Sequence, residues 1–272
     1  MRYEKYEISV QGQLQGPAVL TSYILDAVSV AQDKKRPAVI VCPGGGYRMR
    51  SDRERESVVM KFLGMGCHGG ILDYSVAPDR FPTALRELAA AVALFREHSE
   101  EWLVDPERIF VCGFSAAGHL ACSLGVFWNQ AFVYEAIGKR PEAIRPSGMI
   151  LAYPVITAGE AAHKSSIEKL LGEGASEEEK RQVSLELHVS RDTPRAFIWH
   201  TYEDGTVPVE NSLLLVEAMR RQGVNFELHI YPRGAHGSSL ANEETSGEGE
   251  YAHLNIPCCQ SWISLAETWI NG

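Results

Sequence analysis

A serine stands where an apolar run ends and a helical pattern begins, in the stretch VCGFSAAGHL at residues 111–120. A strand that turns directly into a helix strains the backbone of the residue at the turn and exposes its side chain above the sheet. A nucleophilic serine needs that exposure, so Ser115 is a candidate nucleophile. Serine is also a favoured helix cap, which leaves a structural role open for this residue.

The residues around Ser115 follow the spacing of such a turn only in part. Glycines two positions before and two after the serine let the strand and helix backbones approach closely, and Gly113 meets the first requirement. Ala117 occupies the second position with a single methyl group. This methyl group departs from the pattern, but it is small enough to be compatible with a close approach of strand and helix.

A run of three glycines follows an earlier predicted strand, in CPGGGY at residues 42–47. Glycine backbone N–H groups have no side chain in the way, so they can approach the oxyanion that forms during acyl transfer. A serine hydrolase takes these donors from this loop and from the residue after the nucleophile. The predicted oxyanion donors are Gly45, Gly46 and Ala116, although a glycine run is also typical of a flexible turn.

An acid and a histidine must follow the serine along the chain to complete a catalytic triad of this type. Glu203 and Asp204 come just after the apolar run 195–201, and His236 comes just after the run 226–232. The pattern alone leaves both carboxylates open as the acid. The other histidines precede a strand, lie in polar segments, or are expected to pack in the core, as are His119, His200 and His229.

Six apolar runs alternate with helical patterns and are predicted to be strands. Near-continuous apolar runs are typical of parallel strands that are covered on both faces. The alternation predicts a doubly wound, mostly parallel α/β sheet with helices on both faces, which binds ligands at the carboxyl ends of its strands. The runs EISV and AVLTSYIL are expected to add antiparallel edge strands. The six predicted strands are 37–42, 70–76, 108–114, 147–155, 195–201 and 226–232.

Two capping boxes are predicted, because a serine precedes a glutamate by three positions in each. One pairs Ser51 with Glu54 and opens a helix to about Gly64, and the other pairs Ser176 with Glu179. The whole chain, 1–272, is expected to form a single domain with 156–194 as a small cap-like insertion.

The composition argues against several classes of function. The chain has 26 basic and 35 acidic residues without a basic cluster, so nucleic-acid binding is not expected. No apolar run approaches the ~20 residues of a membrane helix, and the charged N-terminus lacks the pattern of a signal peptide. None of the six cysteines shows C-x-x-C spacing, and four of them lie in apolar runs or helical patterns, which predicts buried free thiols and no metal site. A cytoplasmic location is therefore expected.

Five motifs in order resemble the acetylesterase and acetyl-xylan-esterase-like serine hydrolases of the α/β-hydrolase fold. They are CPGGGY, GFSAAGHLA, AYPVITAGE, WHTYEDGTVPVENS and YPRGAHG, and the resemblance covers about residues 37–270. In that family the acid stands four residues before the proline of a D-x-x-V-P pattern, which implies Asp204. Ser115 and His236 then complete the triad. The chain departs from the family's glycine at Ala117, and Pro43 stands where wider relatives have histidine, but neither change removes a triad atom.

The resemblance implies a serine carboxylesterase that hydrolyses short-chain esters, acetyl esters above all, through an acyl-enzyme. It implies no metal or cofactor, and a small ester as substrate, with acetylated oligosaccharides among the candidates. Tyr47 and Tyr153 are expected to line the substrate pocket, since both lie beside the chemistry. A prolyl-oligopeptidase-like peptidase and a catalytically silent binding protein of the same fold remain alternatives, and a homo-oligomer is left open.

Overall fold

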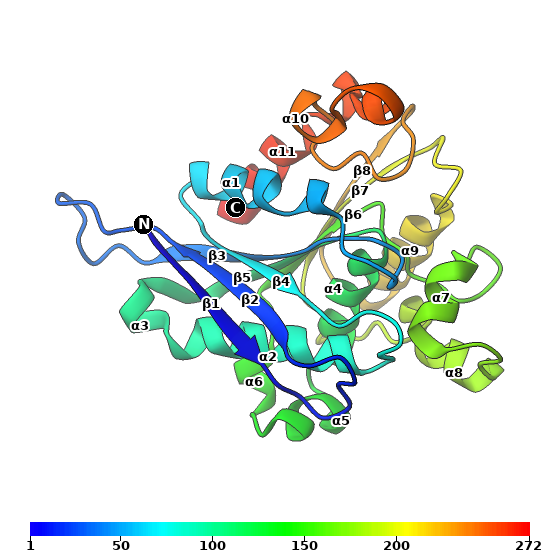
Figure 1. The fold of residues 1–272 in the computed structure, drawn as a ribbon, viewed down its shortest axis with the longest axis horizontal. Coiled ribbons are helices and arrows are strands. Elements are labelled where there is room, and N and C mark those ends of the chain that lie inside the picture. The colour runs from blue at the N-terminus through cyan, green and yellow to red at the C-terminus, as the bar shows by residue number, and fades with distance from the viewer.

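The eight strands form one sheet in the computed structural model, which describes residues 1–272, in the order β1-β2-β4-β3-β5-β6-β7-β8 (Figure 1). β2 pairs antiparallel with both β1 and β4, and the pairs from β4 to β8 are parallel. The predicted mostly parallel sheet with antiparallel strands at one edge is confirmed. The strands are β1 (Arg2–Ile8), β2 (Ala18–Ile24), β3 (Arg36–Cys42), β4 (His68–Asp73), β5 (Val104–Phe114), β6 (Gly148–Ala152), β7 (Ala196–Thr201) and β8 (Phe226–Tyr231).

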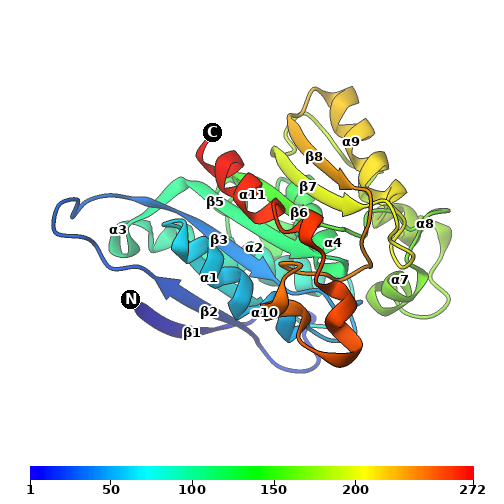
Figure 2. The same ribbon diagram turned by 90° about the horizontal axis from the view of Figure 1, so that it is seen from above.

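Helices cover both faces of this sheet because alternate strand residues point to opposite sides. Val39 and Val41 pack in the hydrophobic cluster that contains α1 (Glu56–Gly64) and α11 (Trp262–Asn271). Ile40 packs in the other cluster, with α2 (Thr83–Glu97), α4 (Ala116–Phe127) and α9 (Glu210–Gln222). Figures 1 and 2 show α1 and α11 together on one side of the sheet. The shorter helices are α3 (Ser99–Trp102), α5 (Ala131–Tyr134), α6 (Pro141–Ile144), α7 (Lys164–Leu171), α8 (Glu177–Gln182) and α10 (Glu243–Ser246).

One of the two predicted capping boxes is wrong. Ser176 and Glu179 form theirs at the start of α8. Ser51 makes no side-chain cap, and a short 3₁₀ turn, Asp52–Glu54, stands where the helix was expected to begin. The Glu54 carboxylate is buried and accepts the N–H of Gly44 instead, so a tertiary contact has replaced the local one.

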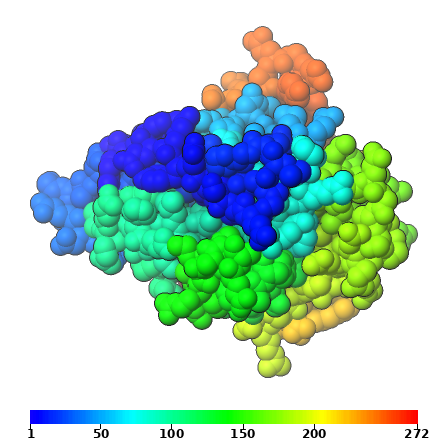
Figure 3. All heavy atoms as spheres, turned by 60° about the horizontal axis from the view of Figure 1, so that its bottom comes forward, coloured from blue at the N-terminus to red at the C-terminus, as the bar shows by residue number.

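The segment 156–194 joins β6 to β7 and carries α7 and α8. Its α7 is attached to the loop after β4, since the N–H of Phe81 donates to the carbonyl of Leu170 (2.9 Å). Figure 3 shows this loop, in cyan, against the yellow-green segment 156–194. Among all the helices, none has the length and apolar character needed to cross a membrane.

Candidate active site

Ser115 lies at the sharp turn between β5 and α4. Its backbone has φ 54° and ψ −119°, a region that costs a residue with a side chain about 1–3 kcal/mol. Backbone hydrogen bonds hold it there, because its N–H donates to Ala152 O (3.0 Å) and its carbonyl accepts the N–H of Val155 (3.0 Å). A Cβ at Gly113 would lie 2.0 Å from the carbonyl oxygen of Ala117, so glycine is required where strand and helix cross.

Ser115, His236 and Asp204 form a continuous chain of hydrogen bonds. The Oγ of Ser115 is 2.7 Å from Nε2 of His236, and Nδ1 of His236 is 2.6 Å from Oδ2 of Asp204. The serine and the acid are almost fully buried, with exposed fractions of 8% and 7%. The structure therefore brings together three residues that are far apart in the sequence, in the geometry that a serine nucleophile and its base require.

Hydrogen-bond donors to both carboxylate oxygens favour the ionised form of Asp204. Its Oδ1 accepts the N–H groups of Thr206 and Val207 (2.9 Å each), and His200 Nε2 lies 3.3 Å from Oδ2. Burial by itself raises the pKa of this carboxyl, but the hydrogen bonds from His200, His236 and Val207 outweigh burial and hold the pKa well below its ordinary value. His200 is buried, as predicted, and it also contacts the acid, a contact that no sequence pattern predicted.

The glycine loop lies directly against Ser115. A Cβ at Gly44 would meet the Cβ of Ser115 at 3.2 Å, and one at Gly45 would lie 2.3 Å from the carbonyl of Met49. The N–H groups of Gly45 and Gly46 donate to no protein acceptor. The N–H of Ala116, in the first turn of α4, has no acceptor within the helix. The three predicted oxyanion donors are thus all free to bind a ligand.

A pocket of about 400 Å³ opens over Ser115 and His236. Its lining contains a single apolar side chain, Met49. His163 and Ser165 reach the pocket from the segment 156–194, and Nδ1 of His163 is 2.7 Å from the hydroxyl of Ser166. The sequence analysis placed His163 in a polar segment and gave it no role, and no motif marked it. The remaining lining residues are Gly45, Gly46, Arg48, Ser51, Arg53, Glu54, Thr206 and Gly237.

Tyr47 and Tyr153 do not line this pocket, so the prediction that they contact substrate is wrong. Tyr47 is 3% exposed, and its hydroxyl bonds to Nδ1 of the buried His119 (2.9 Å). Tyr153 is 1% exposed, and its ring packs edge-on against that of His236, with centroids 5.0 Å apart. Both rings lie beneath the site because each hydroxyl finds its partner in the protein interior.

Glu54 is a buried carboxylate that links the two loops of the site. Its Oε2 accepts the N–H of Gly44 (2.7 Å), and its Oε1 accepts the hydroxyl of Tyr153 (2.6 Å). The same hydroxyl accepts the N–H of Ser239, in the loop after His236 (2.9 Å). Burial raises the pKa of Glu54, while the hydrogen bonds from Tyr153 and Gly44 oppose that rise. Sequence reasoning missed this role because it assigned Glu54 to a helix cap.

Comparison with known proteins gives related results at three levels. The BD-FAE family model matches residues 25–219. Endo-1,4-beta-xylanase B of Butyrivibrio fibrisolvens is 37% identical over 78% of this chain, and the acetylxylan esterase of Xylanibacter ruminicola is 30% identical over 74%. The crystal structure of an acetyl ester-xyloside bifunctional hydrolase from Caldicellulosiruptor lactoaceticus is 37% identical and superposes with a TM-score of 0.81, covering 95% of this chain and 89% of that one.

The two sequence relatives are much longer than the region they share with this chain. The match covers 34% of the Butyrivibrio protein and 40% of the Xylanibacter protein. The similarity therefore concerns one part of each relative.

Proposed function

Because the chain belongs to the BD-FAE family and has the α/β-hydrolase fold, we propose that it is a carboxylic ester hydrolase with Ser115 as nucleophile. The observation that carries the proposal is the Ser115–His236–Asp204 chain of hydrogen bonds at the carboxyl ends of the strands. The names of the relatives, an acetylxylan esterase among them, support ester chemistry.

In the proposed mechanism, His236 Nε2 takes the proton of the Ser115 hydroxyl as Oγ attacks the ester carbonyl. Asp204 fixes the imidazole tautomer through Nδ1 and stabilises the imidazolium that forms. The N–H groups of Gly45, Gly46 and Ala116 bind the oxyanion in this mechanism. The alcohol leaves with the proton from His236, and water then hydrolyses the acyl-enzyme by the same steps.

The lining of the pocket favours a small acyl group on a polar alcohol. A long acyl chain needs apolar walls to leave water, and Met49 is the one apolar side chain that the pocket offers. Short acyl groups, acetyl above all, fit the space close to Ser115, and a carbohydrate alcohol fits the polar rest. The relatives named for xylan and xyloside substrates point the same way.

The acyl preference can be tested with p-nitrophenyl acetate, butyrate, octanoate and palmitate. We expect kcat/KM to fall steeply beyond four carbons, because a longer acyl chain has to lie against the polar groups of the pocket, and covering such groups without new hydrogen bonds costs free energy. A maximum at octanoate or longer would contradict the acetylesterase proposal. Turnover of the acetate above that of the Ser115→Ala variant separates an enzyme from a catalytically silent binding protein.

Glu54 acts in this proposal as a positioning residue for both loops. Glu54→Ala should lower kcat on p-nitrophenyl acetate by roughly 10²-fold, the order expected when catalytic groups shift by about 1 Å. Glu54→Gln, which keeps one acceptor oxygen, should restore part of that loss. The thermal midpoint of each variant measures the structural cost separately. An alanine variant with lowered stability and wild-type kcat would assign Glu54 to the fold alone.

A further inference from the structure

A second hollow, of about 490 Å³, adjoins the pocket over Ser115 and shares the side chain of Arg48 with it. Its floor is the loop after β4, and its far wall is the C-terminal half of α7 together with the residues that follow. The other lining residues are Ala77, Pro78, Arg80, Glu168, Lys169, Gly172 and Glu173.

Backbone hydrogen bonds fix the positions of the two hollows relative to each other. The N–H of Ala77 donates to the carbonyl of Tyr47 (2.8 Å), which ties the floor to the glycine loop, and the loop's other end is bonded to α7. α7 runs along both hollows, since Ser165 lines the first and Glu168 lines the second. At 1.5 Å per helical residue, the C-terminal end of α7 lies about 10 Å along the helix axis from Ser165. The helix therefore extends from the first hollow to the second.

The charged side chains of the second hollow have no partners in the protein. Arg48, Arg80 and Lys169 share it with Glu168 and Glu173, and none of the five makes a side-chain hydrogen bond or an ion pair within 4.0 Å. Arg80 passes over Gly172, where a Cβ would lie 2.3 Å from its Cζ, so packing restricts its position. The second hollow therefore contains both hydrogen-bond donors and acceptors that have no partner within the protein.

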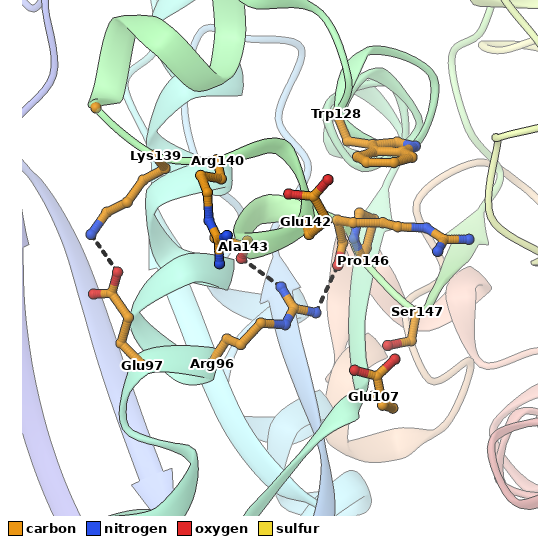
Figure 4. Close-up of a pocket in the computed structure, with 12 residues that line it drawn as sticks. Arg96, Glu97, Glu107, Trp128, Lys139, Arg140, Glu142, Ala143, Pro146 and Ser147 are labelled. Carbon is orange, nitrogen blue, oxygen red and sulfur yellow. Dashed lines mark hydrogen bonds and ion pairs between the residues drawn. The ribbon is translucent and has the colours of Figure 1, made fainter.

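A larger hollow, of about 830 Å³, also contains charged side chains, and some of them are bonded within the protein (Figure 4). It lies near the amino end of β6, opposite the edge that carries Ser115. Its Arg96 donates to the carbonyls of Pro106, Ala143 and Arg145, and its Lys139 pairs with Glu97. The side chains of Glu107, Arg140 and Glu142 in the same hollow make no hydrogen bond or ion pair, so its groups are only partly engaged within the protein. Because it lies at the opposite ends of the strands from Ser115, it is not placed to hold a substrate of that serine.

The mixture of donors and acceptors selects a class of ligand. A hydroxyl group both donates and accepts, so a chain of sugars uses cations and carboxylates together. A ligand that carries only acceptors would leave Glu168 and Glu173 without a donor, and an acyl chain would find little apolar surface there. We infer that the hollow bounded by Arg48, Arg80 and α7 binds the sugar units next to the one whose ester is cleaved, an inference that rests on the proposed function.

The test compares one acetyl group on xylose with the same group on xylotriose, chosen because relatives carry xylan in their names. The wild type should show kcat/KM at least tenfold higher for the trisaccharide. Arg80→Met and Glu168→Gln should each lower kcat/KM for the trisaccharide about tenfold, through KM. The first variant loses a hydrogen bond to a charged group, and the second loses the charge that strengthens one. Both variants should stay within twofold of the wild type on p-nitrophenyl acetate.

The matched control is Arg181→Met, which removes an exposed arginine of the same insertion that lines neither hollow. It should leave both sugar substrates unchanged. Equal wild-type kcat/KM for monosaccharide and trisaccharide would overturn the inference, as would equal losses on all substrates in Arg80→Met. A wild type without activity on p-nitrophenyl acetate would instead contradict the proposed function, and the inference with it.

Discussion

Ser115→Ala should lower kcat for p-nitrophenyl acetate by about 10⁴-fold or more, and adding His236→Ala should cost little further. The reason is that the two side chains perform one proton transfer, across the 2.7 Å between Oγ and Nε2. Once the nucleophile is gone, the base has no proton to take. Single-turnover and steady-state rates of the two single variants and the double variant give the measurement.

A histidine outside the site supplies the control for this prediction. His229 lies in β8 and its ring bonds to Glu227, so His229→Ala should leave kcat unchanged. Losses from Ser115→Ala and His236→Ala that multiply in the double variant would show that the residues act separately. That result would remove the shared mechanism while leaving the fold intact.

Asp204→Asn should lower kcat by roughly 10³–10⁴-fold, and Glu203→Gln should be nearly silent. The Oδ1 of Asp204 is fixed by the N–H groups of Thr206 and Val207, so the asparagine amide would face Nδ1 of His236. A donor there forces the proton of the neutral ring to Nε2, which then cannot accept the proton of the serine. Glu203 is exposed and makes no side-chain hydrogen bond in the site.

The pH profiles of these two variants sharpen the test. Because the pKa of Asp204 lies well below its ordinary value, the carboxylate stays ionised from pH 6 to 9, so the loss in Asp204→Asn should persist across that range. A silent Asp204→Asn variant beside a crippled Glu203→Gln variant would mean that the loop places the other carboxylate on His236 during turnover.

Local patterns in the sequence were sufficient to predict the sheet, the turn at Ser115 and the order of the three catalytic candidates. Apolar runs, helical periodicity and glycines at close approaches act over a few residues, so they can be recognised without knowing what packs against them. The motif register that selected Asp204 over Glu203 also agrees with the structure, where Asp204 is the carboxylate bonded to His236.

Only the tertiary structure decided which polar groups face the pocket and which support it from beneath. Glu54 has the spacing of a helix cap, but its oxygens bond to Gly44 and to Tyr153, 99 residues further along the chain. Tyr47 turns inward to His119 for the same reason. A buried polar side chain takes the direction of its hydrogen-bond partner, because leaving it unpaired costs about 1–3 kcal/mol. That partner is set by how the strands are ordered in the sheet, and no local pattern contains it.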